Sequence, residues 1–336
     1  MFFLIPRITG IVYLFLSIAV YPAYAAAEAG SRPEIREESE ENGFFDLEEH
    51  IDETHEIISD YILSSAQWLD SFFEDKRFVS EENRTRLKVR ISAFSDTQDG
   101  FDIGGGASLR LVLPKLKKRW NIVVSGSSAD EDYEDTKESS GNARKDFVKD
   151  DDNHFTIALQ YFAKTTERNN IKIESGLRWR DNMPVFFAGP RFRWYKQISG
   201  SWALRFTQRF RWYTDEGFYI KSIFDAERPL GDKFFFRSSA EGKWEEGEEG
   251  YEYSFGLGLY HAIGTGRALE YQLSTNFETR PVSVLDEAGI RIRYRQKIWR
   301  KWLTLEISPQ ISFPREENYD IVPGILLQLE AVFGKI

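Results

Sequence analysis

The chain has 336 residues, of which 15% are aromatic, and it contains no cysteine. The lack of cysteine excludes disulfides, a cysteine-linked lipid anchor, and any metal site or nucleophile built on cysteine. The formal net charge of −10 is unevenly placed, since residues 26–85 alone hold 18 acidic and 5 basic side chains, a net of −13, and no basic tract indicates nucleic-acid binding.

The first 25 residues carry the pattern of a secretory signal peptide. A positive charge at Arg7 precedes most of an apolar stretch, which ends in the small-x-small tripeptide Ala23-Tyr24-Ala25. We therefore expect residues 1–25 to be cleaved after export, with an uncleaved anchor as the alternative. After Ala25 no stretch approaches the roughly 18 apolar residues that a membrane-spanning helix needs, so a helical membrane protein is not predicted.

Two acidic segments of different character follow. Residues 26–42 are almost devoid of apolar side chains, which is typical of a disordered linker. In residues 43–80 apolar side chains recur at three- and four-residue steps, which predicts an amphipathic helix whose other face is acidic. The apolar stripe of this helix comprises Leu47, Ile51, Ile58, Ile62, Trp68, Leu69 and Phe72.

From Arg86 the hydrophobic period changes to two, which indicates β-strands. Leu87, Val89 and Ile91, for example, alternate with Lys88 and Arg90. About fourteen segments follow this rule, each near the ten-residue length of a tilted strand that crosses a bilayer. They start near residues 86, 101, 119, 153, 169, 185, 200, 217, 233, 250, 267, 287, 301 and 321.

The connections between these segments are of two alternating kinds. Short and partly basic turns alternate with generally longer and mostly acidic loops, of which residues 126–152 are the longest. Outer-membrane barrels combine an even strand number with short periplasmic turns and longer external loops, so both chain ends are expected in the periplasm. Tryptophans collect at both membrane interfaces. Here they border the turns (Trp120, Trp194, Trp202, Trp299, Trp302) and the loops (Trp179, Trp212, Trp244).

Over residues 86–336 these patterns resemble the bacterial outer-membrane β-barrel, porin-like proteins as a class, without a motif of one family. The resemblance implies an all-β fold: an antiparallel transmembrane barrel of about fourteen strands in the outer membrane of a Gram-negative cell. The amphipathic helix predicted from the periodicity of residues 43–80 would precede it on the periplasmic side. It also implies contact with outer-membrane lipid and lipopolysaccharide, and insertion by the barrel assembly machinery. Such barrels commonly end on an aromatic residue, whereas here Phe333 is fourth from the end.

The polar face of the strands is the candidate functional site. If the apolar face meets lipid, the charged residues line the lumen, where arginine rows would attract anionic or zwitterionic solutes. The alternative is arginine–glutamate pairing that fills and stiffens a closed barrel. The predicted lumen or pathway residues are Arg178, Arg180, Arg191, Arg193, Arg205, Arg209, Arg211, Arg237, Glu241, Arg291, Arg293 and Arg295.

The sequence offers little for catalysis, and we predict no enzyme, no catalytic residues and no cofactor. Outer-membrane phospholipases pair a histidine with a serine near the outer rim, but His261 lies near a predicted turn and His154 has no clear serine partner. The acidic loop of residues 126–152 has no calcium-loop spacing, so no metal site is predicted.

The leading functional prediction is a porin-like channel or solute conduit. Its acidic helix, which begins beside the basic turns and carries an apolar stripe that needs a cover, would plug the barrel or dock at its rim. Two alternatives for the helix are a periplasmic protein partner and the membrane surface. For the protein as a whole, the alternatives are a non-conducting structural or assembly component that recruits a periplasmic partner and, third, a lipid-modifying enzyme.

Overall fold

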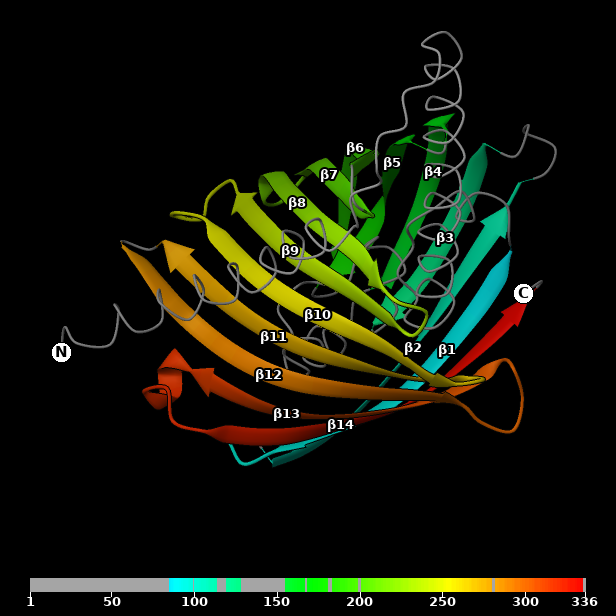
Figure 1. Ribbon diagram of the computed structural model, residues 1–336. Helices are drawn as coiled ribbons and strands as arrows, with labels where there is room; N and C mark the ends of the chain where they lie inside the picture. The colour runs from blue at the N-terminus through cyan, green and yellow to red at the C-terminus, as the bar shows by residue number, and fades with distance from the viewer. Residues whose placement is uncertain are drawn as a thin grey trace, which may run out of the picture. The chain divides into compact units, whose positions relative to one another are not determined.

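The computed structural model describes residues 85–98, 100–113, 119–127, 155–166, 168–180, 183–198, 201–279 and 282–334. In these residues fourteen antiparallel strands follow one another around a closed barrel (Figure 1). The strands are β1 (Arg86–Asp96), β2 (Gly100–Val112), β3 (Trp120–Ser127), β4 (Phe155–Thr165), β5 (Asn169–Arg180), β6 (Met183–Ile198), β7 (Trp202–Tyr213), β8 (Gly217–Leu230), β9 (Phe234–Glu245), β10 (Glu252–Gly264), β11 (Arg267–Thr279), β12 (Ser283–Lys297), β13 (Leu303–Pro314) and β14 (Val322–Gly334).

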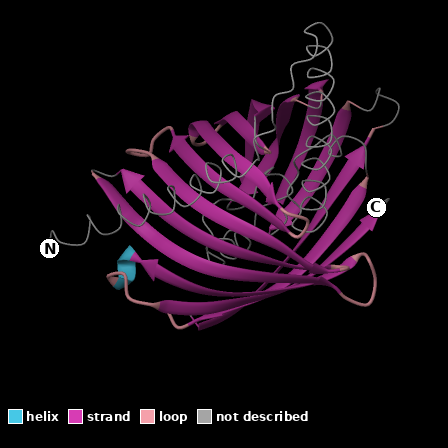
Figure 2. Ribbon diagram, in the orientation of Figure 1, coloured by secondary structure: helices cyan, strands magenta, loops and turns pink. Residues whose placement is uncertain are grey.

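The predicted barrel of about fourteen strands is confirmed. Every predicted segment coincides with an observed strand, and no predicted start lies more than four residues from the observed one. The helix within the described residues is the single 3-10 turn Arg315–Glu317, between β13 and β14 (Figure 2). Among the described residues, no helix is long and apolar enough to cross a membrane. The predicted signal peptide, linker and amphipathic helix lie outside the described residues.

Pairing of the first strand with the last closes the barrel. β1 pairs with β14 over eleven residues, from Arg86 opposite Gly334 to Asp96 opposite Gly324. Every other strand pairs with its two neighbours in the chain, so each backbone edge is used. Closure matters because an unpaired strand edge in hydrocarbon would leave N–H and C=O groups without hydrogen bonds, which costs several kcal/mol per group.

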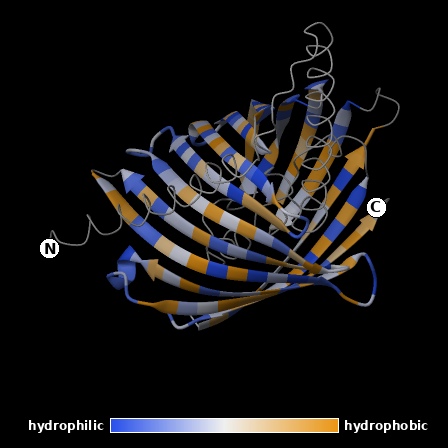
Figure 3. Cartoon of the chain, viewed as in Figure 1, coloured by the Kyte–Doolittle hydropathy of each residue, from blue (hydrophilic) through white to orange (hydrophobic). Residues whose placement is uncertain are grey.

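The two faces of the wall have inverted polarity compared with a soluble protein. Large apolar side chains at alternate positions are exposed on the outside, such as Ile91 (59%), Ile290 (47%) and Leu327 (45%). Charged and polar side chains at the intervening positions are buried, and the strands show alternating blue and orange bands (Figure 3). An apolar outer face around a polar interior is the arrangement of outer-membrane barrels, so this chain is a bacterial outer-membrane β-barrel.

Aromatic side chains mark both ends of the strands. Trp120, Trp202 and Trp302 stand at the turn ends of β3, β7 and β13, while Trp179 and Trp212 stand at the loop ends of β5 and β7. Several of them pack on a second ring, with centroids 4.7 Å apart for Trp120 and Tyr161, 5.5 Å for Phe155 and Trp179, and 5.1 Å for Trp302 and Phe333. These rings form the two girdles expected where a barrel meets the membrane interfaces.

The predicted difference in loop length between the two rims holds only in part. The rim predicted to be external carries the long connection of residues 128–154, but also the two-residue connection 181–182. At the other rim, tight turns use a left-handed backbone at Gly231 (φ 65°) and Gly266 (φ 72°). Glycine adopts this conformation at no steric cost, which allows β8–β9 and β10–β11 to join directly.

The orientation of the barrel is a prediction that labelling can test. An epitope inserted between Ser139 and Ser140, in the long connection between β3 and β4, is expected to be labelled on intact cells, because the longer acidic loops face outward. An epitope inserted in the β8–β9 turn at Gly231 serves as the control, and we expect it to be labelled after permeabilisation. The reverse pattern would overturn the orientation.

Candidate functional site in the barrel interior

The barrel interior is lined by charged side chains with a positive excess. Among the described residues, thirteen basic side chains are buried against seven acidic ones. The basic set is Lys88, Arg90, Arg110, Lys172, Arg191, Arg193, Arg205, Arg209, Arg211, Lys221, Arg291, Arg293 and Arg295. The acidic set is Glu174, Asp225, Glu227, Glu270, Glu287, Glu306 and Glu330.

The predicted pathway residues lie on the inward face wherever their side chains are described. Eight of them are buried members of the basic set above. Arg178 is partly buried, and the side chains of Arg237 and Glu241 are 12% and 8% exposed. Arg180 ends β5, and its side chain is outside the description, as are the apolar stripe residues of the predicted helix. The assignment of these residues to a solute pathway stays a prediction.

One network surrounds Glu306 on β13. Arg293 donates to its carboxylate through Nε and Nη2, each at 2.9 Å, in a bidentate pair. Arg291 and Arg295 approach the same carboxylate at 3.4 Å, and Ser308 Oγ donates to it at 2.9 Å. The Glu306 side chain is 1% exposed, so this carboxylate holds three arginines in one place away from bulk water.

The Glu306 network continues around the wall in both directions. Arg293 Nη1 donates to Glu270 on β11 at 2.7 Å, and Arg295 Nη2 donates to Glu330 on β14 at 2.7 Å. Glu330 in turn lies 3.8 Å from Lys88 and from Arg90 on β1. Five neighbouring strands are thereby cross-linked by charge-assisted contacts.

A second network joins β7, β8 and β9. Arg205 donates to Oδ2 of Asp225 through Nε at 3.0 Å and Nη2 at 2.8 Å, while Ser239 donates to Oδ1 at 2.5 Å. Glu227 lies between Arg205 at 3.7 Å and Arg237 at 3.2 Å. Here acidic and basic groups are balanced, two against two.

The third region, on β5–β7, is strongly positive. On these three strands a single acidic side chain, Glu174, faces the interior beside seven basic ones, which are Lys172, Arg178, Arg191, Arg193, Arg205, Arg209 and Arg211. Glu174 accepts from Lys172 at 2.5 Å, Arg211 at 3.0 Å and Gln160 at 3.0 Å. The positive excess of the interior is therefore concentrated on one part of the wall.

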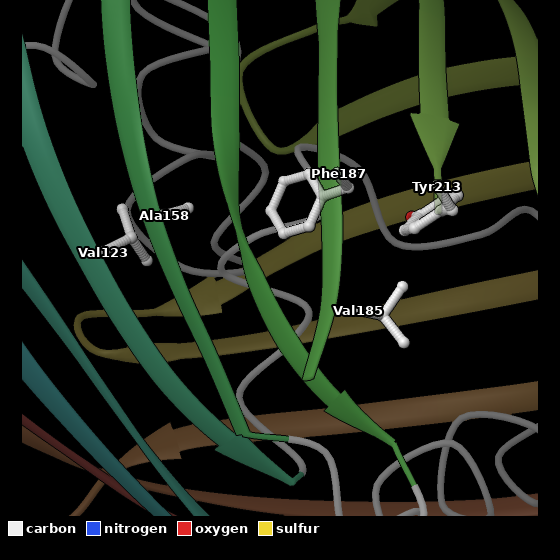
Figure 4. Packing of buried hydrophobic residues seen from close by; sticks show 5 residues of the cluster. All are labelled: Val123, Ala158, Val185, Phe187 and Tyr213. Atoms are coloured by element: carbon white, nitrogen blue, oxygen red, sulfur yellow. The ribbon is translucent and has the colours of Figure 1, made fainter. Parts of the chain in front are cut away.

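An apolar patch faces the interior next to this positive region. Val123, Ala158, Val185, Phe187 and Tyr213, from β3, β4, β6 and β7, form a buried cluster (Figure 4). Arg211 lies with its guanidinium carbon 5.2 Å from the Phe187 ring centroid and 5.8 Å from that of Tyr213, within cation–π range. Gly176 lies between Ala158 and Phe187 in the strand register and leaves the space that the Phe187 ring fills, since a Cβ there would stand 2.7 Å from Cζ of that ring.

Sequence reasoning missed parts of this interior. It did not place the apolar patch, because it expected inward positions to be polar throughout. It also left out of the predicted site the acidic partners Asp225, Glu227 and Glu330, and the cations Lys88, Arg90, Arg110 and Lys221. The signal for these was present, since each alternates along its strand with outward apolar residues, as Lys88 and Arg90 do with Leu87 and Val89.

His261 is the histidine that lies within the described residues, and its contacts do not support a catalytic role. The His261 ring stacks on Phe234, with centroids 4.2 Å apart and planes at 19°, near the turn end of β10. The other three histidines lie outside the described residues.

No protein-family model matches this chain, and no curated relative does either. Among solved structures, the chain is similar to OprB of Pseudomonas putida (TM-score 0.47, 8% identity, 76% of this chain and 95% of that one). It is also similar to the anion-selective porin of Comamonas acidovorans (TM-score 0.43, 7% identity, 74% and 98%) and to OccK5 of Pseudomonas aeruginosa (TM-score 0.40, 11% identity, 76% and 99%). These likenesses concern the fold alone.

Proposed function

We propose that this barrel is a porin-like conduit for charged solutes, with an arginine- and glutamate-lined lumen that its N-terminal acidic segment closes. The observation that supports the proposal is the excess of thirteen buried basic over seven buried acidic side chains on the inward face. Pairing that served only to fill and stiffen a wall would need balanced charges, because every surplus ion carries a desolvation cost of several kcal/mol. A surplus of one sign is instead what attracts solutes of the other sign.

The proposed closure rests on charge and on place. Residues 26–85 carry a net charge of −13, opposite in sign to the interior excess. β1 begins and β14 ends at the same rim, so the segment that precedes β1 is attached at that rim. The predicted apolar stripe, from Leu47 to Phe72, would also find a cover against the barrel. This segment lies outside the described residues.

Deletion of residues 26–78 tests the conduit and its closure together. In planar bilayers, the shortened protein is expected to open more often or to a larger conductance than the full mature chain. Its reversal potential in a KCl gradient is expected to show selectivity for chloride over potassium, because basic side chains outnumber acidic ones in the barrel interior. Deletion of residues 26–42 alone is the control, since it shortens the linker and leaves the predicted helix in place.

A second candidate function is favoured by the Glu306 network. Five strands cross-linked by buried ion pairs would suit a closed, non-conducting barrel that recruits a periplasmic protein through its N-terminal helix. This reading predicts no conductance before or after the deletion, together with loss of a co-purifying protein when residues 26–78 are removed. We propose neither an enzyme nor a bound cofactor in either case.

A further inference from the structure

Five basic side chains form one continuous row across five neighbouring strands. In the strand register, Lys172 on β5 lies opposite Arg191 on β6, Arg191 opposite Arg209 on β7, Arg209 opposite Lys221 on β8, and Lys221 opposite Lys243 on β9. Residues opposite each other in antiparallel strands point to the same face. We refer to these five residues as the cationic row.

The cationic row is an arrangement that folding alone disfavours. Side chains directly opposite each other have Cβ atoms roughly 4.5–5.5 Å apart, and like charges at such positions are destabilising. Carboxylates lie beside the ends of the row, with Glu174 2.5 Å from Lys172 and Glu252 3.2 Å from Lys243. Glu241 lies 2.8 Å from Lys221, and Arg191, the second member of the row, donates to the side-chain amide oxygen of Asn170 at 2.7 Å.

Strand tilt turns this row into a path along the barrel. Lys172 is the fourth residue from the turn end of β5, and Arg191 is the eighth from the turn end of β6. Lys221 is the fifth residue from the loop end of β8, and Lys243 is the third from the loop end of β9. Because cross-strand rows run perpendicular to strands that tilt by roughly 35–45°, the row climbs from one rim toward the other.

The apolar patch runs beside the cationic row in the same register. Ala158 lies opposite Gly176, Gly176 opposite Phe187, and Phe187 opposite Tyr213, so these residues form a parallel row on β4–β7. On β5, β6 and β7 each is four residues from the member of the cationic row on the same strand, as Phe187 is from Arg191. Apolar side chains lower the local dielectric, which strengthens the attraction between neighbouring cations and an anion.

We propose that the cationic row is a track for linear anions that carry several phosphate or carboxylate groups. With strands roughly 4.8 Å apart, its four strand-to-strand steps span about 19 Å, far more than one phosphate covers. A chain of anionic groups can contact several of the row's cations at once and bind by multivalency. Guanidinium and ammonium groups both bind these oxyanions, the former through a planar fork. The inference rests on the proposed conduit, whose substrate class it specifies.

Tripolyphosphate and orthophosphate are suitable probes, because they differ in the number of linked phosphates and not in kind. Titration calorimetry on the full mature chain in detergent is expected to show tripolyphosphate binding at least 100-fold more tightly than orthophosphate. In planar bilayers, micromolar tripolyphosphate is expected to block the chloride current while orthophosphate at that concentration leaves it unchanged.

Substitutions test whether tripolyphosphate binds at the cationic row. Arg209→Gln is expected to weaken tripolyphosphate binding about tenfold, the effect of one lost charge-assisted contact, while Arg209→Lys retains most of the affinity. Arg110→Gln is the matched control, since it removes one buried interior arginine on β2, away from the row, and should change the affinity less than twofold. Heat-modifiable migration in gel electrophoresis verifies that each variant forms a barrel.

The outcomes separate the track from the conduit. Tight tripolyphosphate binding without any conductance would support the proposed anion track and contradict the proposed conduit. A chloride current together with equally weak binding of tripolyphosphate and orthophosphate would support the conduit and contradict the anion track. Equal losses of tripolyphosphate affinity in Arg209→Gln and Arg110→Gln would also contradict the anion track, because binding would then depend on the total charge of the interior and not on the cationic row.

Discussion

Replacing Glu306 by glutamine lowers the free energy of unfolding of the barrel by about 3–5 kcal/mol, the usual effect of removing one partner from a buried ion pair. The Glu306 carboxylate is 1% exposed, and it is the shared acceptor of Arg291, Arg293 and Arg295. Glutamine keeps the shape and one carbonyl oxygen, but it removes the carboxylate charge that three buried guanidinium groups share, and leaves Arg293 with Glu270 and Arg295 with Glu330 as carboxylate partners. Urea unfolding in lipid vesicles, followed by tryptophan fluorescence, measures the loss.

The same substitution at the rim is the matched control for Glu306. Glu252 pairs with Lys243 at 3.2 Å, but its side chain is 39% exposed, so Glu252→Gln is expected to cost less than about 1 kcal/mol. In addition, Glu306→Gln combined with Arg293→Gln should recover part of the loss, because the bidentate pair is then removed as a unit. Equal effects of the two single substitutions would contradict a desolvated network.

Replacing Ile290 by arginine is expected to cost roughly 2–4 kcal/mol, the range for arginine on the lipid face near the bilayer midplane. Ile290 is the central residue of β12 and is 47% exposed on the outer face. Its cross-strand neighbours Leu273 and Ile311 are also apolar and exposed on the outer face, so an arginine there has no acidic partner opposite it. Urea unfolding in vesicles again gives the measurement.

Ile290→Val is the control for the lipid-face prediction. It keeps the side chain apolar and β-branched and removes one methylene, so its effect should stay below about 1.5 kcal/mol. If arginine and valine were tolerated alike at this position, the outer face of β12 would not be in contact with hydrocarbon.

The sequence by itself determined the strands, their number and, outside the apolar patch, the face on which each side chain lies. These features follow from the period of two, which every strand carries within its own ten or so residues: Ile290 and Arg291 are neighbours in the chain and face opposite sides of the wall. The aromatic girdles were predictable for the same reason, since Trp179 and Trp212 stand at strand ends that the period itself delimits.

Only the tertiary structure decided which charges meet. Arg295 reaches Glu330 across 35 residues of sequence, and the cationic row exists because four successive strand pairs keep one register. Register depends on the turns and on local departures such as the irregularity between Phe162 and Lys164 in β4, which shifts the pairing with β5 beside Lys172. The alternation of one strand contains no information about its offset from the next, and a slip by two residues would preserve both faces while separating every pair.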